Sequence, residues 1–155
     1  MPTYKQKALE VLKNHKFRIT KPREMVIELL GKSKEPLNPY EMKDILDRKH
    51  NKIDIVSIYR IIKCLEDNNL VHRVLSTNKV AKCQIEHEDK CTKESNHHCH
   101  HLLICEKCSS IEEVHCAGVD LIIKKLEKDS NFKIKRHDLE FYGFCSNCIK
   151  AKKKN

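Results

Sequence analysis

Cys105-Glu106-Lys107-Cys108 and Cys145-Ser146-Asn147-Cys148 are the two short segments around which the second half of this chain is organised. Two residues separate the cysteines of each pair, so a single tight turn can direct both sulfur atoms at one tetrahedral cation. Four thiolates make a closed Zn²⁺ site, because zinc has no ligand-field preference and accepts soft sulfur donors. The alternatives are two disulfides or four buried thiols. A disulfide within either pair would be strained, and no secretory context is visible, so we predict a structural zinc site with the ligands Cys105, Cys108, Cys145 and Cys148.

The composition is that of a chain with small aliphatic cores. Its 155 residues fit one domain, or two small ones if a metal site supplements the core. Aromatic residues reach only 5% and charged residues 34%. No apolar run approaches the roughly 20 residues of a membrane span, and no signal segment follows Met1. We therefore expect a cytoplasmic protein without a membrane partner, in which nine cysteines indicate metal or redox chemistry.

Charge and potential metal ligands are distributed unevenly along the chain. Residues 1–83 hold 18 Lys+Arg against 10 Asp+Glu, whereas residues 84–155 hold 13 against 12. Seven of the nine Cys and seven of the ten His lie after position 83. This distribution favours a polyanion-binding half joined to a metal-binding half. An ordinary solvated basic surface is the alternative that charge alone leaves open.

Apolar spacing in the basic half predicts four helices, over residues 4–15, 20–31, 38–46 and 54–65. Thr20 is placed to cap the second helix, with Pro22 in its first turn, and Gly31 to end it. Asn38 and Glu41 form a capping box at the start of the third. These caps indicate short, separately terminated helices.

The fourth helix has the pattern of a DNA-recognition helix. Its apolar positions can face a core while polar ones turn outward, namely Ser57, Arg60 and Lys63, with Tyr59 near the boundary. Two strands over residues 70–75 and 80–85, joined by a turn at 76–79, give a plausible hairpin wing. Helices followed by a wing favour winged-helix DNA binding, although three amphipathic helices can also be only a core.

The metal-rich half begins with a hydrophilic segment, residues 86–101, that is loaded with His and Cys. After it the pattern predicts one helix over 119–128 and strands over 102–104, 111–114, 132–134 and 139–141. A strand-rich domain with one helix could pair with a second copy across a two-fold axis, which would match a palindromic DNA site.

Several stretches together resemble the ferric uptake regulator family of bacterial metal-sensing repressors. They are Phe17 to Arg23, Ser57-Ile58-Tyr59-Arg60, the His-rich run leading into Leu103-Ile104-Cys105, the Cys105/Cys108 pair, and His137 with Tyr142-Gly143-Phe144-Cys145. Val71 to Asn78, followed by Cys83, looks most like the zinc uptake regulator branch.

The resemblance implies an α+β fold: a winged-helix DNA-binding domain over residues 1–85, a His/Cys-rich hinge over 86–101, and a small α/β dimerisation domain over 102–155 that carries the four-cysteine zinc site. It implies a homodimer that binds palindromic double-stranded operator DNA when zinc-loaded and represses zinc-uptake genes. It implies no enzyme activity and no small-molecule substrate.

The resemblance also implies a regulatory zinc site at the hinge, on His72, Cys83, Glu113 and one histidine of 97–101. We favour His98, seven residues before Cys105, although His97, His100, His101, Cys91 or Cys99 could take its place. Such a mixed site suits zinc and would bind it more weakly than four thiolates do. A third site would use His100, Asp120 and His137.

In the DNA complex that this implies, Tyr59 would contact a base, most simply a thymine methyl group. Arg18, Arg23, Arg60 and Lys63 would hold phosphates, with Ser57 on the same outward face.

Three rival functions remain. An iron sensor, or a sensor of Fe²⁺-dependent peroxide chemistry, is disfavoured by Cys83, because ferrous sites prefer oxygen and imidazole ligands. A zinc enzyme is disfavoured because no HExxH motif occurs. A zinc-buffering or interaction module would suit residues 86–101.

Overall fold

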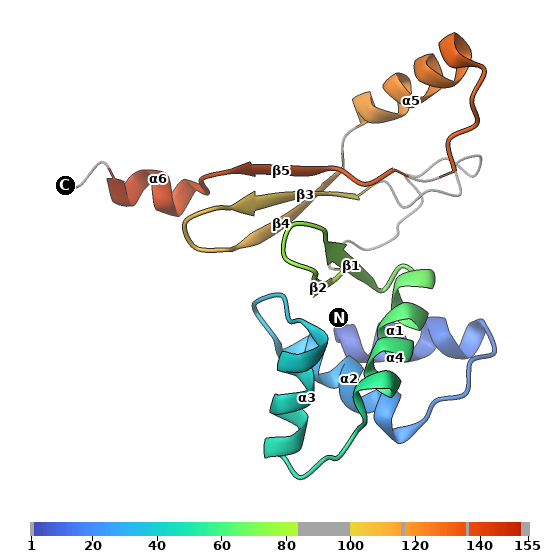
Figure 1. Cartoon of the computed structure of the whole chain (residues 1–155), viewed down its shortest axis with the longest axis vertical. Coiled ribbons are helices and arrows are strands. Elements are labelled where there is room, and N and C mark those ends of the chain that lie inside the picture. Colours follow the sequence, from blue (N-terminus) through green and yellow to red (C-terminus); the bar gives the residue numbers. More distant parts are fainter. Residues whose placement is uncertain (1, 84–99, 116, 136, 153–155) are drawn as a thin grey trace. The chain divides into compact units, whose positions relative to one another are not determined.

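The computed structural model describes residues 2–83, 100–115, 117–135 and 137–152 (Figure 1). The chain divides into two compact units, residues 1–84 and 85–155. Most of the predicted hinge, 86–101, lies outside the described residues, so its role stays a prediction. Within the described residues, no helix is both long enough and apolar enough to cross a bilayer.

Four helices build the first unit: α1 (Tyr4–Asn14), α2 (Lys21–Lys32), α3 (Pro39–Arg48) and α4 (Ile55–Asp67). The capping box predicted for α3 is present: the Asn38 side chain accepts from the Glu41 N–H, and the Glu41 carboxylate accepts from the Asn38 N–H. Asp54 caps α4 by accepting from the Ser57 N–H at 2.8 Å. Thr20 is the N-cap of α2, but its side chain makes no capping hydrogen bond.

The prediction that Gly31 ends α2 is wrong, because the helix continues to Lys32 and is capped by Ser33. Gly31 does not end the helix; it allows a neighbouring ring to pack closely against α2. A Cβ atom at position 31 would lie 3.2 Å from Cδ1 of Tyr4. Gly31 therefore makes room for the Tyr4 ring between α1 and α2.

A hairpin follows α4 and completes the first unit. Its strands β1 (Val71–Val74) and β2 (Lys79–Lys82) pair antiparallel, with His72 opposite Ala81. β1 is shorter than predicted; β2 begins one residue earlier than predicted and ends at Lys82, and residues 84 and 85 of the predicted strand lie outside the described residues. A further bridge between Leu37 and Val80 attaches the hairpin to the segment before α3.

The core of the first unit draws on every helix and the hairpin. From α4 it takes Ile58, Ile61, Ile62 and Leu65. Because these residues face inward, Arg60 and Lys63 are left exposed.

The described residues of the second unit form a three-stranded sheet and two helices, α5 (Ala117–Ser130) and α6 (Ser146–Lys152). Its strands are β3 (His100–Cys105), β4 (Ile111–His115) and β5 (Glu140–Gly143), and β3 lies in the middle (Figure 1). β4 runs antiparallel to β3, and β5 runs parallel to it. These two units confirm the predicted α+β fold class.

The predicted strand at 132–134 does not form. The Ile134 N–H, which a strand would offer to a neighbour, donates to the Glu127 carboxylate of α5 at 2.7 Å. Helix α6 was not predicted; it continues the turn of the second cysteine pair, where the Ile149 N–H donates to the Cys145 carbonyl.

Candidate metal centres and nucleic-acid interface

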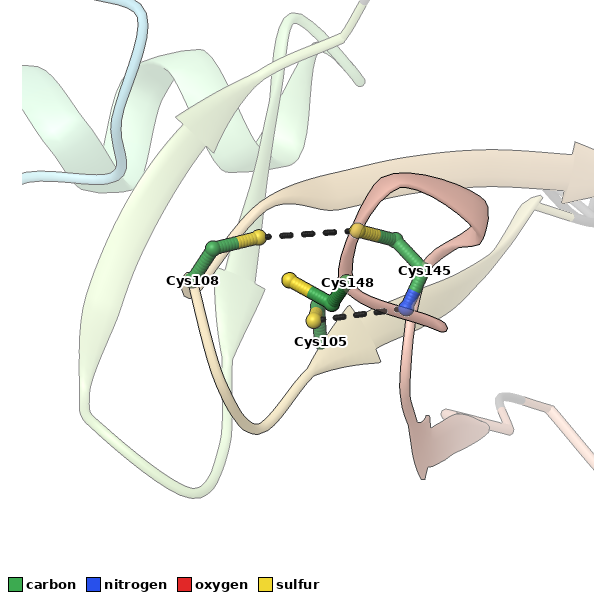
Figure 2. A group of neighbouring side chains, drawn as sticks. All are labelled: Cys105, Cys108, Cys145 and Cys148. Atoms are coloured by element: carbon green, nitrogen blue, oxygen red, sulfur yellow. Dashed lines mark hydrogen bonds between the residues drawn. The ribbon is translucent and has the colours of Figure 1, made fainter. Parts of the chain in front are cut away.

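The two cysteine pairs meet at one end of the second unit's sheet. Cys105 ends β3, and Cys145 lies two residues after the last residue of β5, Gly143. Because β5 runs parallel to β3 with Gly143 opposite Cys105, the two strands deliver both pairs to the same place. Figure 2 shows the four side chains converging, and their sulfur atoms all lie within 4.8 Å of one another. The arrangement fits a structural zinc ion held by four thiolates.

The cluster's thiols differ in acidity. The Cys145 N–H donates to Cys105 Sγ at 3.3 Å and lowers the pKa of the Cys105 thiol to about 6. Burial raises the pKa of the Cys148 thiol to about 12. Zinc binds the thiolate form, so loading this cluster must displace a proton from Cys148, and zinc affinity should rise with pH.

A second pair of donors lies on the hairpin of the first unit. His72 is in β1, and Cys83 directly follows β2. A ring nitrogen of His72 and Cys83 Sγ lie within 4.8 Å of each other. Antiparallel pairing explains this, because the Cys83 N–H donates to the Leu70 carbonyl at 2.9 Å and continues the ladder past β2. Of the other predicted ligands, half-buried Glu113 lies in β4 of the second unit, and His98 lies outside the described residues.

The residues predicted for a third site are placed in part. Asp120 lies in the first turn of α5, and His100 begins β3. The ring of half-buried His137 lies 5.5 Å, between centroids, from the ring of fully buried His101. From the sequence, His101 is predicted only as an alternative regulatory ligand. What pairs it with His137 is the β3–β5 alignment, in which the Leu102 N–H donates to the Leu139 carbonyl, and that alignment leaves no local pattern in the sequence.

The outward face of α4 carries the residues predicted to contact DNA. Tyr59 is 39% exposed, and Arg60 and Lys63 are exposed as predicted. Lys63 pairs with Asp67 at 2.6 Å, and the Ser57 hydroxyl donates to Asp54 at 2.6 Å. Two of the predicted contacts are therefore engaged within the helix in this state.

Tyr40 is a candidate that the sequence analysis did not single out. It lies in the first turn of α3 and is 63% exposed. Its ring meets the ring of Tyr59 edge to face, with centroids 6.5 Å apart and planes at 83°. The available signal was its place in the first turn of a helix whose start the Asn38–Glu41 capping box marks.

The other two predicted DNA contacts are Arg18, in the loop before α2, and Arg23, in the first turn of α2. Arg18 is exposed, and its carbonyl accepts a hydrogen bond from the Arg23 guanidinium. The same guanidinium lies 5.8 Å from the centroid of the Phe17 ring. Arg23 thus orders this loop, and its contact with phosphate, like that of Arg18, stays a prediction.

A model of the ferric uptake regulator family matches residues 14–142. The chain belongs to this family. The ferric uptake regulation protein of Bacillus subtilis is 25% identical over 88% of this chain and 89% of its own length. The zinc uptake regulation protein of Escherichia coli is 24% identical over 93% of this chain and 80% of its own.

Among solved structures, a zinc uptake regulator complexed with zinc and DNA superposes with a TM-score of 0.85. It covers 99% of both chains at 22% identity, so this likeness concerns the fold. Members of the ferric uptake regulator family are transcription regulators and not enzymes, and the present chain is a metal-responsive transcriptional regulator. The predictions of the family and of a protein without enzyme activity are confirmed.

Proposed function

We propose that this regulator senses zinc and, when its regulatory site is loaded, binds palindromic double-stranded operator DNA as a cytoplasmic homodimer that represses zinc-uptake genes. The observation that carries the proposal is the His72–Cys83 pair, whose donor atoms lie within 4.8 Å of each other. An imidazole beside a thiolate suits zinc, whereas a ferrous site would favour oxygen donors in place of the sulfur. Fe²⁺ is therefore the less suitable ion.

The remaining regulatory ligands come from the rest of the chain. We assign Glu113 and His98 to complete a four-coordinate site of mixed nitrogen, sulfur and oxygen donors. His72 and Cys83 belong to the first unit and Glu113 to the second. An ion bound by all of them would restrict how the units orient, and so favour the arrangement that fits DNA.

The DNA-binding surface in this proposal centres on α4. Tyr59 contacts a thymine methyl group, and Tyr40 supports its ring from α3. Exposed Arg60 binds phosphate. To bind a phosphate, Lys63 gives up its ion pair with Asp67. The free-energy cost is small because exposed ion pairs contribute little to stability.

Exposed apolar side chains of the second unit support the homodimer. Among its described residues, the buried apolar side chains are only Leu102, Cys105 and Val119. Many large ones remain exposed, including Leu121, Ile122, Leu126, Phe132, Phe141 and Phe144. A second copy would cover such a surface, and a two-fold axis would present two α4 helices to a palindrome.

The test is a gel-shift titration of the full chain on a palindromic promoter fragment, with and without zinc, after the four-cysteine site has been filled. Zinc should tighten binding by a factor of about 5 to 150, the usual range for coupled sites. Cys83→Ser should abolish that gain. Cys64→Ser is the matched control, because Cys64 is a half-buried thiol of α4 outside both clusters.

The same titration separates the rival functions. A shift that requires Fe²⁺ and not Zn²⁺ would identify an iron sensor. Retention of zinc-dependent binding by Cys83→Ser would disprove the ligand assignment. Zinc binding without any zinc-dependent shift would favour a buffering module.

A further inference from the structure

The peptide groups flanking Leu70 form a junction between three parts of the first unit. The Leu70 N–H donates to the Leu65 carbonyl of α4 at 2.9 Å. The Leu70 carbonyl accepts two hydrogen bonds, from the Cys83 N–H at 2.9 Å and from the Tyr4 hydroxyl of α1 at 2.9 Å. Leu70 therefore joins the end of α4, the segment after β2 that carries Cys83, and helix α1.

The junction is short and buried. α4 ends at Asp67 with Asn68 as its C-cap, and Asn69 takes a left-handed conformation, with φ 56°, while its N–H donates to the Glu66 carbonyl. Leu70 is 8% exposed, and β1 starts at the next residue. Residues 68–71 alone separate the end of α4 from His72, and Leu70 in the middle of this segment is held by three hydrogen bonds.

Tyr4 is held so that its hydroxyl reaches this carbonyl. Its ring packs on Gly31, where a Cβ atom would come within 3.2 Å of Cδ1. The helix that carries it is fixed separately by Lys5, which pairs with Glu24 at 2.8 Å and Glu28 at 2.9 Å. The packing of the Tyr4 ring on Gly31, and not the Lys5 ion pairs, therefore holds the Tyr4 hydroxyl against the Leu70 carbonyl.

We propose that Tyr4 is a positioning residue for the sensing thiolate: its hydroxyl orients the Leu70 carbonyl, which in turn fixes the backbone of Cys83, whose Sγ lies within 4.8 Å of a His72 ring nitrogen. The inference rests on the proposed function, because it takes Cys83 as a regulatory ligand. Zn–S and Zn–N bonds tolerate only narrow ranges of length, near 2.3 and 2.0–2.1 Å, so a small rotation of this peptide plane weakens chelation. Hydrogen-bonded groups behind a ligand commonly tune affinity in this way.

The test compares Tyr4→Phe with Lys5→Gln in the full chain, with the four-cysteine site filled first. Tyr4→Phe removes one hydroxyl and keeps the ring on Gly31. Lys5→Gln weakens the attachment of α1 without touching Leu70, so it reports loss of stability alone. Zinc affinity of the weaker site is measured by competition with a chromophoric chelator, the absorption band of a Cys83 thiolate bound to Co²⁺ is recorded, and thermal unfolding is followed.

Tyr4→Phe should weaken zinc binding about threefold to tenfold, the range expected for one hydrogen bond, and shift the cobalt band. Lys5→Gln should lower the unfolding temperature and leave both metal readouts unchanged. Unchanged zinc affinity in Tyr4→Phe, or equal losses of affinity in both variants, would overturn the inference.

Cys83→Ser in the same assay separates this inference from the function on which it rests. If Cys83→Ser abolishes the cobalt band while Tyr4→Phe changes neither readout, the sensing site stands and the role of Tyr4 falls. If Cys83→Ser leaves the weaker site intact, both fall.

Discussion

Sγ of Cys108 lies 3.6 Å from Sγ of Cys145, although 37 positions separate the two residues. Their proximity follows from parallel pairing of β3 with β5, since each strand ends beside one cysteine pair. Among the described residues the second unit buries little apolar surface, so a metal ion bound by both pairs would supply cohesion that the core does not.

Cys108→Ser should therefore unfold much of the second unit. One thiolate is lost from a closed site, and without the ion the end of β3 is joined to the segment before α6 only by hydrogen bonds, among the described residues, such as that from the Cys145 N–H to Cys105 Sγ. Metal analysis should show a loss of about one zinc per chain, and amide hydrogen exchange should quicken throughout β3. Cys64→Ser should change neither quantity. Normal protection of β3 in zinc-free Cys108→Ser would show that the ion is dispensable for folding.

Arg60→Ala should weaken binding to every DNA sequence by a similar factor. Its exposed guanidinium is placed for phosphate, and a phosphate contact carries no sequence information. Binding measured across a range of salt concentrations should show a slope smaller in magnitude by about 1. A loss confined to the operator would instead make Arg60 a base-contacting residue.

Unlike Arg60→Ala, Tyr59→Ala should weaken binding to the operator more than binding to random DNA and so reduce the preference for the operator. Removal of the ring would eliminate the proposed thymine contact and leave the proposed phosphate contacts in place, at a cost of about 1–3 kcal/mol on the operator alone. Tyr59→Phe keeps the apolar ring edge to face with Tyr40 and should retain the preference. Equal losses on operator and random DNA for Tyr59→Ala would disprove its contact with a base.

Glu28→Gln should reduce the acid sensitivity of the first unit. Hydrogen bonds from Lys32 and Lys5 lower the pKa of the Glu28 carboxyl from 4.5 to about 2. Because the folded pKa is the lower one, the carboxylate stabilises the fold fully above pH 4.5, and that contribution disappears as the pH falls towards 2.

The measurement is hydrogen exchange of α2 amides at pH 5 and pH 3. The loss of protection between these values should be smaller in Glu28→Gln than in the wild type. Glu10→Gln, a change at an exposed position of α1, should behave as the wild type does. An unaltered loss in Glu28→Gln would exclude this ion pair as a source of acid sensitivity.

His137→Asn should remove a metal from the second unit without affecting the four-cysteine site. The third site predicted from the sequence takes His100, Asp120 and His137 as ligands, and the centroid of the His137 ring lies 5.5 Å from that of buried His101. Metal content at saturating zinc should fall by about one ion per chain, while His15→Asn, an exposed position after α1, should leave it unchanged. Full metal content in His137→Asn would exclude this third site.

Local chemistry accounts for what could be predicted from the sequence. A capping box such as Asn38 with Glu41, or two cysteines separated by two residues, acts within one turn, so its consequence is visible in the sequence itself. The parts that were wrong or missed depend on partners far along the chain. The role of Gly31 depends on the Tyr4 ring, which packs against it. His137 lies beside His101 because of the alignment of β3 with β5. The Glu127 carboxylate accepts the Ile134 N–H that a strand at 132–134 would have used.

The Leu70 junction has an evolutionary consequence. The Leu70 carbonyl accepts from the Cys83 N–H at the end of the hairpin, and the Leu70 N–H donates to the Leu65 carbonyl in the last turns of α4. A mutation that moves the hairpin backbone therefore also moves the end of α4, and the reverse holds. Descendants of this protein that adapt the hairpin to another metal are therefore expected to acquire compensating changes in α4. Metal preference and operator preference should consequently diverge together among its relatives.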